Sequence, residues 1–275
     1  MTALEAVRDL AASFGESGVP SPRVDAEILV SDVLGITRSE LYADGRDVSD
    51  DEAGRLESLA ERRRAREPLA YILGEWGFRG LNLKVDGRAL IPRPETEVVV
   101  ERCLVHLRDI PEPRVLDVGV GSGAIALSIA DEHPGAKVVG VDYCASALSL
   151  AEENRLRTAV DGRVQLLESD LLDEVAGRFD LVVSNPPYVS PDEYESLQPE
   201  IRLYEPRKAV IGVEVGAEIA REARRVLVPG GWIVLECGDG QGAHLAAELE
   251  AFGYTDVVQT PDLAGRDRVV EGRWE

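Results

Sequence analysis

An apolar strand runs directly into a glycine-rich turn near the middle of the chain. The apolar run covers residues 115–118, the turn covers 119–123, and a helical stretch follows over 125–130. Glycine lets the backbone approach a ligand closely. The next apolar run ends in Asp142, about 20 residues beyond the turn, where an acid can bind ribose hydroxyls in nucleotide-binding βαβ units. Alone, this pattern is ambiguous, because Rossmann dehydrogenases show nearly the same spacing and a glycine turn can be purely structural.

The hydrophobic pattern changes once along the chain and predicts three segments. Residues 1–70 show helical periodicity, with helix-start signals at Ser21-Pro22 and Ser49-Asp50. Residues 71–93 alternate and are punctuated by glycine, which predicts a linking β-hairpin. From 94 to 275 short apolar strands alternate with helical segments, as in a parallel sheet covered on both faces. A length of 275 residues with 44% hydrophobic content suffices for one large and one small domain.

A second motif, Asn185-Pro186-Pro187-Tyr188, follows the apolar run at residues 179–184. Proline fixes φ and lacks an N–H, so the Pro186 carbonyl is held beside the Asn185 side-chain oxygen. Two acceptors can then bind one planar NH₂ group, and the Tyr188 ring can pack on its flat face. The alternative is an ordinary turn after a strand. Together with the glycine turn and Asp142, the motif predicts a methyltransferase that depends on S-adenosylmethionine.

Further motifs are spread over nearly the whole chain. They are Glu67-Pro68-Leu69-Ala70-Tyr71-Ile72-Leu73-Gly74-Glu75, Leu90-Ile91-Pro92-Arg93-Pro94-Glu95-Thr96-Glu97, Tyr204-Glu205-Pro206, Leu235-Glu236-Cys237-Gly238 with Gln241, and Asp262-Leu263-Ala264-Gly265-Arg266-Asp267-Arg268. With these segments the chain resembles the bacterial protein-glutamine methyltransferases of peptide chain release factors, often called the HemK family. The sister group of this family, which methylates a ribosomal protein, differs around the segment that ends in Glu97, so this segment favours the release-factor branch.

The resemblance implies a class I methyltransferase fold, which is Rossmann-like with a mostly parallel seven-stranded sheet, and a small N-terminal helical domain that docks the substrate. It also implies that residues 255–259 and 268–271 form the antiparallel end of the sheet. It implies that the glycine turn packs on the methionine part of S-adenosylmethionine, that Asp142 binds ribose, and that Asp170 with Leu171 borders the adenine. The implied cofactor-binding residues are Gly119, Val120, Gly121, Ser122, Gly123, Asp142, Asp170, Leu171 and Asn185. The implied substrate-binding residues are Asn185, Pro186, Pro187 and Tyr188, of which Asn185, Pro186 and Tyr188 are catalytic.

The implied reaction is direct attack of a glutamine amide nitrogen, in the Gly-Gly-Gln loop of release factors, on the sulfonium methyl group. No general base is evident, because His106, His133 and His244 lie in or beside predicted helices and are expected at the surface. The chain departs from the family pattern at residues 212–217, where Gly-Val-Glu-Val-Gly-Ala replaces a usual Gly-Gly-x-Asp-Gly-Leu. Any role of the missing glycine and aspartate, such as shaping the outer substrate pocket, is therefore not carried over.

Net charge and the placement of the cysteines argue against several other classes of function. A net charge of −21 repels phosphates, so direct nucleic acid binding is not expected. The basic run at residues 62–66 is read as a solvated helix face, with contact to an acidic protein as the alternative. Cys103, Cys144 and Cys237 show neither a disulfide framework nor metal-ligand spacing, which favours the cytoplasm and no metal site. The N-terminal residues predict no secretory signal, and no apolar run is long enough to span a membrane.

Two other functions remain open from the sequence. A methyltransferase acting on the exocyclic amine of adenine could use the same acceptors, but it would need a flipped base and a basic channel. A cofactor-binding interaction protein without catalytic activity is the other alternative, and the intact motif from Asn185 to Tyr188 counts against it.

Overall fold

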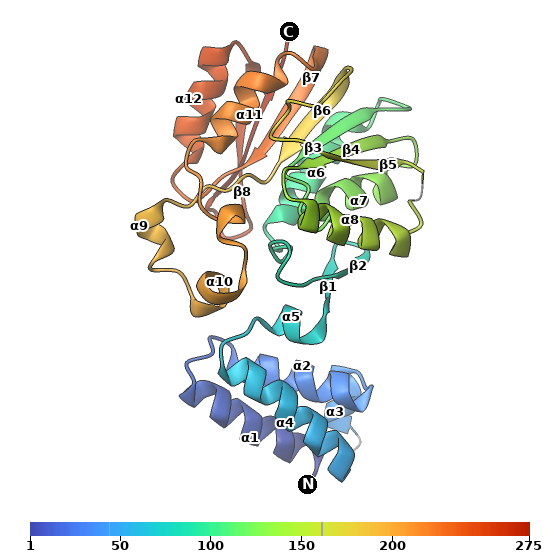
Figure 1. Cartoon of the computed structure of the whole chain (residues 1–275), viewed down its shortest axis with the longest axis vertical. Coiled ribbons are helices and arrows are strands. Elements are labelled where there is room, and N and C mark those ends of the chain that lie inside the picture. The colour runs from blue at the N-terminus through green and yellow to red at the C-terminus, as the bar shows by residue number, and fades with distance from the viewer. Residues whose placement is uncertain (44, 161) are drawn as a thin grey trace. The chain divides into compact units, whose positions relative to one another are not determined.

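The computed structural model describes residues 1–43, 45–160 and 162–275. These residues form two compact units (Figure 1). The helical unit contains Met1–Glu75 and a distant segment, Gln198–Tyr204. The α/β unit contains Trp76–Leu197 and Glu205–Glu275. A segment that the hydrophobic pattern assigned to the larger domain therefore belongs to the helical unit.

The helical unit is built around its own apolar core, which includes Phe14, Leu29 and Leu41. The predicted start signals are confirmed, because helices begin at Pro22 and Asp50. Ser49 and Glu52 form a capping box, in which each side chain accepts a hydrogen bond from the other residue's backbone N–H. The helices are α1 Ala3–Glu16, α2 Pro22–Leu34, α3 Arg38–Ala43, α4 Asp50–Arg64, α5 Leu69–Leu73 and α10 Pro199–Tyr204.

Ion pairs within the helical unit neutralise the basic run at residues 62–66. Arg63 is only 4% exposed, and its guanidinium donates to Asp25 at 2.7 Å and to Glu200 at 2.8 Å. Arg66 donates to both oxygens of the Glu200 carboxylate. The prediction of a solvated helix face is therefore wrong at Arg63. Glu200 also explains why α10 belongs to this unit, because removing one partner of a buried ion pair costs several kcal/mol.

A seven-stranded, mostly parallel sheet forms the centre of the α/β unit and confirms the predicted fold class. Its strand order is β5-β4-β3-β6-β7-β9-β8, and β9 runs antiparallel to both of its neighbours. Chain order reverses between β3 and β6, the position where open α/β sheets bind ligands. The sheet strands are β3 Arg114–Val118, β4 Lys137–Asp142, β5 Val164–Glu168, β6 Phe179–Ser184, β7 Leu227–Glu236, β8 Thr255–Pro261 and β9 Asp267–Arg273, and a separate two-stranded sheet pairs β1 Glu75–Phe78 with β2 Leu81–Lys84.

Helices cover both faces of the sheet (Figure 1). Alternate residues of a strand enter opposite cores: Val115 packs with α6 and α7, and Leu116 packs with α11 and α12. His106 of α6 stacks on Trp232, with ring centroids 3.7 Å apart, and its side chain is 10% exposed, so its predicted surface position is wrong. The helices are α6 Thr96–Leu107, α7 Ala124–Glu132, α8 Ala145–Arg157, α9 Pro191–Tyr194, α11 Val215–Ala223 and α12 Gly242–Phe252, with a 3₁₀ turn at Arg207–Ala209. Across the described ranges, no helix combines the length and apolarity needed to cross a bilayer.

Candidate active site

A cavity of about 560 Å³ opens at the carboxyl edge of the sheet. Its size lies within the range of small-molecule sites. The segments that follow β3, β4, β5 and β6 all line it, as expected for ligand sites of open α/β sheets. The cavity brings together Gly119, Val120, Gly121, Ser122, Asp142, Asp170, Leu171, Asn185, Pro186 and Pro187. Gly123 and Tyr188 are not among the described residues that line it.

The glycine turn uses its glycines for two different purposes. Gly119 has φ 76°, and a Cβ placed on it would meet no atom within 4 Å, so its backbone presents an open face. Gly123 has φ 88° at the start of α7, and a Cβ there would lie 2.9 Å from Leu127 Cδ1. The first position therefore suits close approach of a ligand, and the second lets the helix pack tightly against the turn.

Asp142 links β4 to the glycine turn. One carboxylate oxygen accepts from Gly121 N at 3.0 Å, and the other accepts from Cys144 N at 2.9 Å. Burial raises the pKa of Asp142, and these backbone donors oppose the rise. A carboxylate has about four lone-pair sites, so Asp142 keeps acceptor capacity for ligand hydroxyls while it holds the turn in place.

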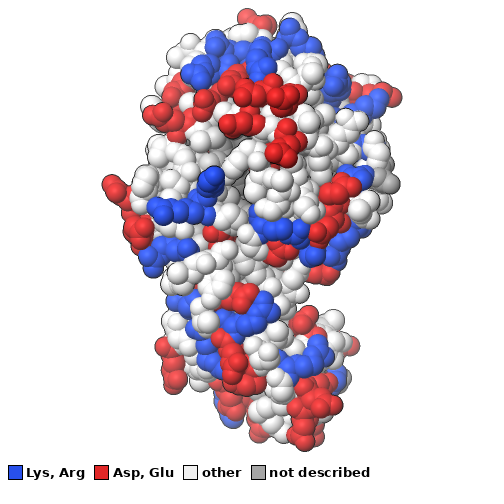
Figure 2. All heavy atoms as spheres, viewed as in Figure 1, with Lys and Arg blue, Asp and Glu red and all other residues white. Residues whose placement is uncertain are grey.

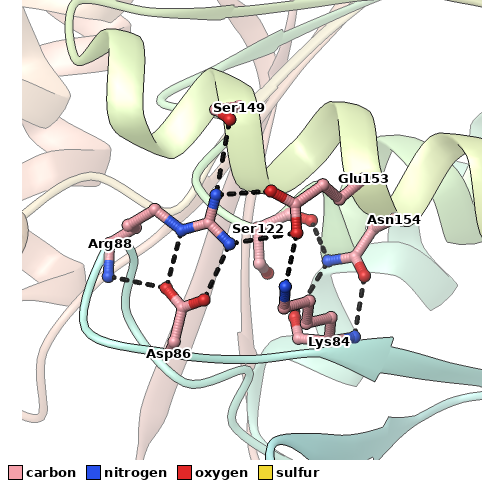
Figure 3. Close-up of polar contacts among 7 residues, drawn as sticks. All are labelled: Lys84, Asp86, Arg88, Ser122, Ser149, Glu153 and Asn154. Carbon is pink, nitrogen blue, oxygen red and sulfur yellow. Dashed lines mark hydrogen bonds and ion pairs between the residues drawn. The ribbon is translucent and has the colours of Figure 1, made fainter.

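Asn154 also anchors the glycine turn, a role that was not predicted from the sequence. Figure 3 shows its side chain extending from α8 to β2 and to Ser122. Its Nδ2 donates to Ser122 O at 2.9 Å and to Lys84 O at 3.0 Å, and its Oδ1 accepts from Lys84 N at 2.7 Å. The side chain is fully buried. Its spacing from Leu150, four residues earlier on the apolar side of α8, is the signal that could have identified it.

The second cluster in Figure 3 clamps the loop after β2 onto α8. The Arg88 guanidinium donates to both oxygens of Asp86 and of Glu153. Since Arg88 also lines the cavity, this ion-pair cluster orders one of its walls.

Asp117 lies in β3, shortly before the glycine turn, and is almost fully buried. Its Oδ2 accepts from Ala126 N at 3.0 Å, and its Oδ1 has no hydrogen-bond partner among the described residues. Burial raises the pKa of Asp117 to about 7, with a smaller contribution from the nearby charge of Asp142. The folded protein therefore holds a proton on Asp117 at pH values where the unfolded chain has lost it.

We expect Asp117→Asn to change how stability depends on pH. The folded pKa lies above the unfolded value of 3.8, so the contribution of Asp117 to stability is greatest below pH 3.8 and falls as the pH rises towards 7. The free energy of unfolding of the variant should therefore rise relative to wild type by about 1.4 kcal/mol per pH unit between pH 5 and 6, less steeply from pH 6 to 7, and level off above. Urea unfolding at pH 5, 6, 7 and 8 measures this difference. Parallel curves for the two proteins would contradict the assignment.

A hydrogen-bonded network orients the Asn185 motif. Asn185 Nδ2 donates to Thr96 Oγ1 at 3.2 Å, and Thr96 Oγ1 donates to Glu236 Oε2 at 2.7 Å. The Tyr188 hydroxyl donates to Glu236 Oε1 at 3.4 Å, and Gln241 Nε2 donates to Tyr188 O at 2.9 Å. Burial raises the pKa of Glu236 to about 7 and that of Tyr188 to about 12. Hydrogen bonds therefore hold the motif at both its first residue, Asn185, and its last residue, Tyr188.

No individual role was predicted from the sequence for Glu236 or Gln241, and no bonding partner was predicted for Thr96. Glu236 is the last residue of β7, as Asp142 is of β4. Because ligands of open α/β sheets bind at the carboxyl ends of the strands, an acid at this position could have been identified from the sequence. Tyr188 directs its hydroxyl to Glu236. Packing of its ring on a substrate group stays a prediction.

Two further contacts involve residues that line the cavity. Arg93 forms an ion pair with the buried Glu205, whose carboxylate also accepts from Ile91 N at 3.4 Å. This pair joins two of the segments that carried the family resemblance. A Cβ on Gly212 would lie 2.9 Å from Pro187 Cγ, so the segment that departs from the family pattern packs directly on the Asn185 motif.

The charges around the cavity are balanced. Its lining includes three basic residues, Arg88, Arg93 and Lys208, and three acidic residues, Asp142, Asp170 and Glu218. Figure 2 likewise shows Lys and Arg mixed with Asp and Glu over the face in view. Such a lining is not the basic channel that a flipped nucleotide requires.

Comparison with known proteins gives the family context. Residues 5–74 match the model of the PrmC N-terminal domain, and residues 98–200 match that of the methyltransferase small domain. The chain is 42% identical over 267 residues to the release factor glutamine methyltransferase of Deinococcus radiodurans, covering 95% of each chain. It is 37% identical over 276 residues to that of Escherichia coli, covering 98% of this chain and 96% of the relative. A solved T. thermophilus 16S rRNA N2 G1207 methyltransferase, in complex with AdoMet and guanosine, shares the fold with a TM-score of 0.53 at 21% identity, over 73% of this chain and 50% of that chain.

Proposed function

Because the chain belongs to the family of release factor glutamine methyltransferases, we propose that it methylates the side-chain amide nitrogen of the glutamine in the Gly-Gly-Gln loop of peptide chain release factors. The methyl donor is S-adenosylmethionine. The observation that carries the proposal is the orientation of Asn185 at the cavity. Its Nδ2 is bound by Thr96, which leaves Oδ1 available to accept from a substrate NH₂ group.

The residues around the cavity suit this cofactor, which supplies an electrophilic methyl group on a sulfonium. The open face of Gly119 can accommodate the methionine part, and Asp142 has lone pairs free for the ribose hydroxyls. Asp170 and Leu171 would border the adenine. Leu171 has φ 45°, an uncommon conformation for leucine, and such strained residues often occur at ligand sites.

In the proposed reaction, Asn185 Oδ1 and the Pro186 carbonyl accept hydrogen bonds from the glutamine NH₂ group. An amide nitrogen is a poor nucleophile because its lone pair is delocalised into the carbonyl. The two acceptors favour a geometry in which the lone pair points at the methyl group, and alignment at about 3–3.5 Å removes the entropy of encounter. The nitrogen–carbon bond forms as the carbon–sulfur bond breaks and its electrons pass to sulfur. The proton then leaves the nitrogen for water.

We further propose that the helical unit docks the protein substrate. All described residues that line the cavity belong to the α/β unit, and the helical unit has a separate core. The helical unit can therefore bind parts of the protein substrate that lie away from the reacting glutamine. Remote binding energy raises kcat/KM for an intact substrate above that for a fragment. We also propose a cytoplasmic location, which the three free cysteines support.

One experiment tests the function and the docking role together. Methyl transfer from labelled S-adenosylmethionine is measured to a purified release factor, a short Gly-Gly-Gln peptide, a DNA duplex and no acceptor. Transfer to the release factor supports the proposal, whereas transfer only to the duplex indicates an adenine methyltransferase, and no transfer indicates a binding protein. Equal kcat/KM for peptide and intact factor would exclude docking. A deletion of the helical unit must also replace residues 198–204, because Glu200 pairs with Arg63 and Arg66.

A further inference from the structure

The side-chain amide of Asn185 has two ends of similar shape and opposite hydrogen-bonding character. Only its oxygen can accept from a substrate NH₂ group, whereas its nitrogen would repel that group. Nothing within the sequence Asn-Pro-Pro-Tyr determines which end faces the cavity. The orientation must therefore come from residues elsewhere in the fold.

Thr96 supplies a directional contact. A hydroxyl carries one proton, and with Glu236 ionised that of Thr96 is directed at Glu236 Oε2, 2.7 Å away. The remaining lone pairs of Thr96 Oγ1 can only accept, so the Asn185 Nδ2 end binds there, at 3.2 Å. Thr96 is 4% exposed and Glu236 is 1% exposed, so solvent does not compete for these bonds.

The fold holds this relay in place from three elements. Thr96 is the first residue of α6, and Glu236 is the last residue of β7. β7 pairs with β6, with Leu235 opposite Ser184, which sets Glu236 beside Asn185 at the same edge. The Tyr188 hydroxyl and the Arg268 guanidinium, 3.4 and 3.9 Å from Glu236 Oε1, hold the carboxylate with its other oxygen towards Thr96.

We propose that Thr96 is a positioning residue, which fixes the amide of Asn185 through the relay to Glu236 so that Oδ1 faces the glutamine NH₂ group. Thr96 also lines the cavity, and in this proposal it acts on Asn185 and not on the reacting atoms. This inference rests on the proposed function, because it presumes a substrate NH₂ group that needs an acceptor. It adds a residue whose contribution appears in kcat and acts only through Asn185.

The first test compares Thr96→Val with Thr96→Ser. Valine has nearly the shape of threonine and lacks the hydroxyl, so the single-turnover rate should fall about tenfold, as for loss of one buried hydrogen bond. Serine keeps the hydroxyl and should restore the rate to within threefold. KM for the release factor and Kd for the cofactor should change less than twofold in both. The matched control is Thr158→Val, because the Thr158 hydroxyl donates to the Arg155 carbonyl, at 3.0 Å, and Thr158 is not among the described residues that line the cavity.

The second test is a double-mutant cycle with Asn185→Ala. If Thr96 acts only through Asn185, Thr96→Val should lower the rate less than twofold in the Asn185→Ala background. A tenfold fall in that background would overturn the proposal, as would a wild-type rate for Thr96→Val alone. If Asn185→Ala keeps the wild-type rate, the proposed function fails and the relay with it. A large effect of Asn185→Ala with none of Thr96→Val refutes the relay alone. Thr96→Ala completes the same cycle if the valine variant does not fold.

Discussion

Replacing Asn185 with alanine is expected to lower the rate of methyl transfer about 100-fold or more, while docking of the release factor is nearly unchanged. Asn185 provides one acceptor, and that acceptor matters most while the amide nitrogen turns towards the methyl group. Loss of one preorganised polar group in an active site typically costs this much in kcat. Docking should spread over a larger surface, so KM changes little. Single-turnover rates at saturating cofactor and release factor measure the effect directly.

Cofactor binding must be measured separately, since Asn185 lines the cavity that is proposed to hold the cofactor. Asn82→Ala serves as the matched control, because Asn82 is an exposed asparagine on β2 that does not line the cavity. Rates of Asn185→Ala within threefold of wild type would mean that Asn-Pro-Pro-Tyr is only a turn here. The functional proposal would then lose its main physical support.

Replacing Asp142 with alanine is expected to weaken cofactor binding roughly tenfold to a hundredfold, the loss of a charged hydrogen bond worth about 1.5–3 kcal/mol. The structure adds a second consequence. Gly121 N and Cys144 N both donate to this carboxylate, so its removal also leaves two backbone donors without their acceptor and lowers the melting temperature. Calorimetric titration with S-adenosylmethionine measures the first effect, and thermal unfolding without cofactor measures the second.

Two further variants separate the roles of Asp142. Asp142→Asn keeps the shape and one acceptor, so it should recover part of the thermal stability while affinity stays low. Asp170 is exposed at the same cavity, so Asp170→Ala should affect affinity without a change in melting temperature. Unchanged affinity of Asp142→Ala would remove Asp142 from the cofactor site, whatever happens to its stability.

Local patterns in the sequence were sufficient for the fold class and for most of the cavity. Three features could be recognised from a few adjacent residues each: the glycine turn, the acid that ends β4 and the motif that follows β6. The turn residues and the apolar alternation in these segments indicate the same local structure in most proteins. Parallel strands end at one edge of a sheet, so residues at successive strand ends could be placed together without knowledge of the strand order. Asp142, Asp170 and Asn185 line one cavity for this reason.

Contacts between distant parts of the chain were decided only by the tertiary structure. Glu200 lies 137 residues from Arg63 in the sequence, and its carboxylate binds Arg63 and so links α10 to the helical unit. Local composition predicted that this arginine would be exposed to solvent, whereas the structure buries it. Thr96 and Glu236 are 140 residues apart, yet their hydrogen bond orients the side chain on which the proposed chemistry depends. Hydrophobic periodicity records which side of an element is buried. Hydrophobic periodicity does not identify the polar residue that a buried side chain bonds to, because that partner is determined by the strand order and by the register of neighbouring strands.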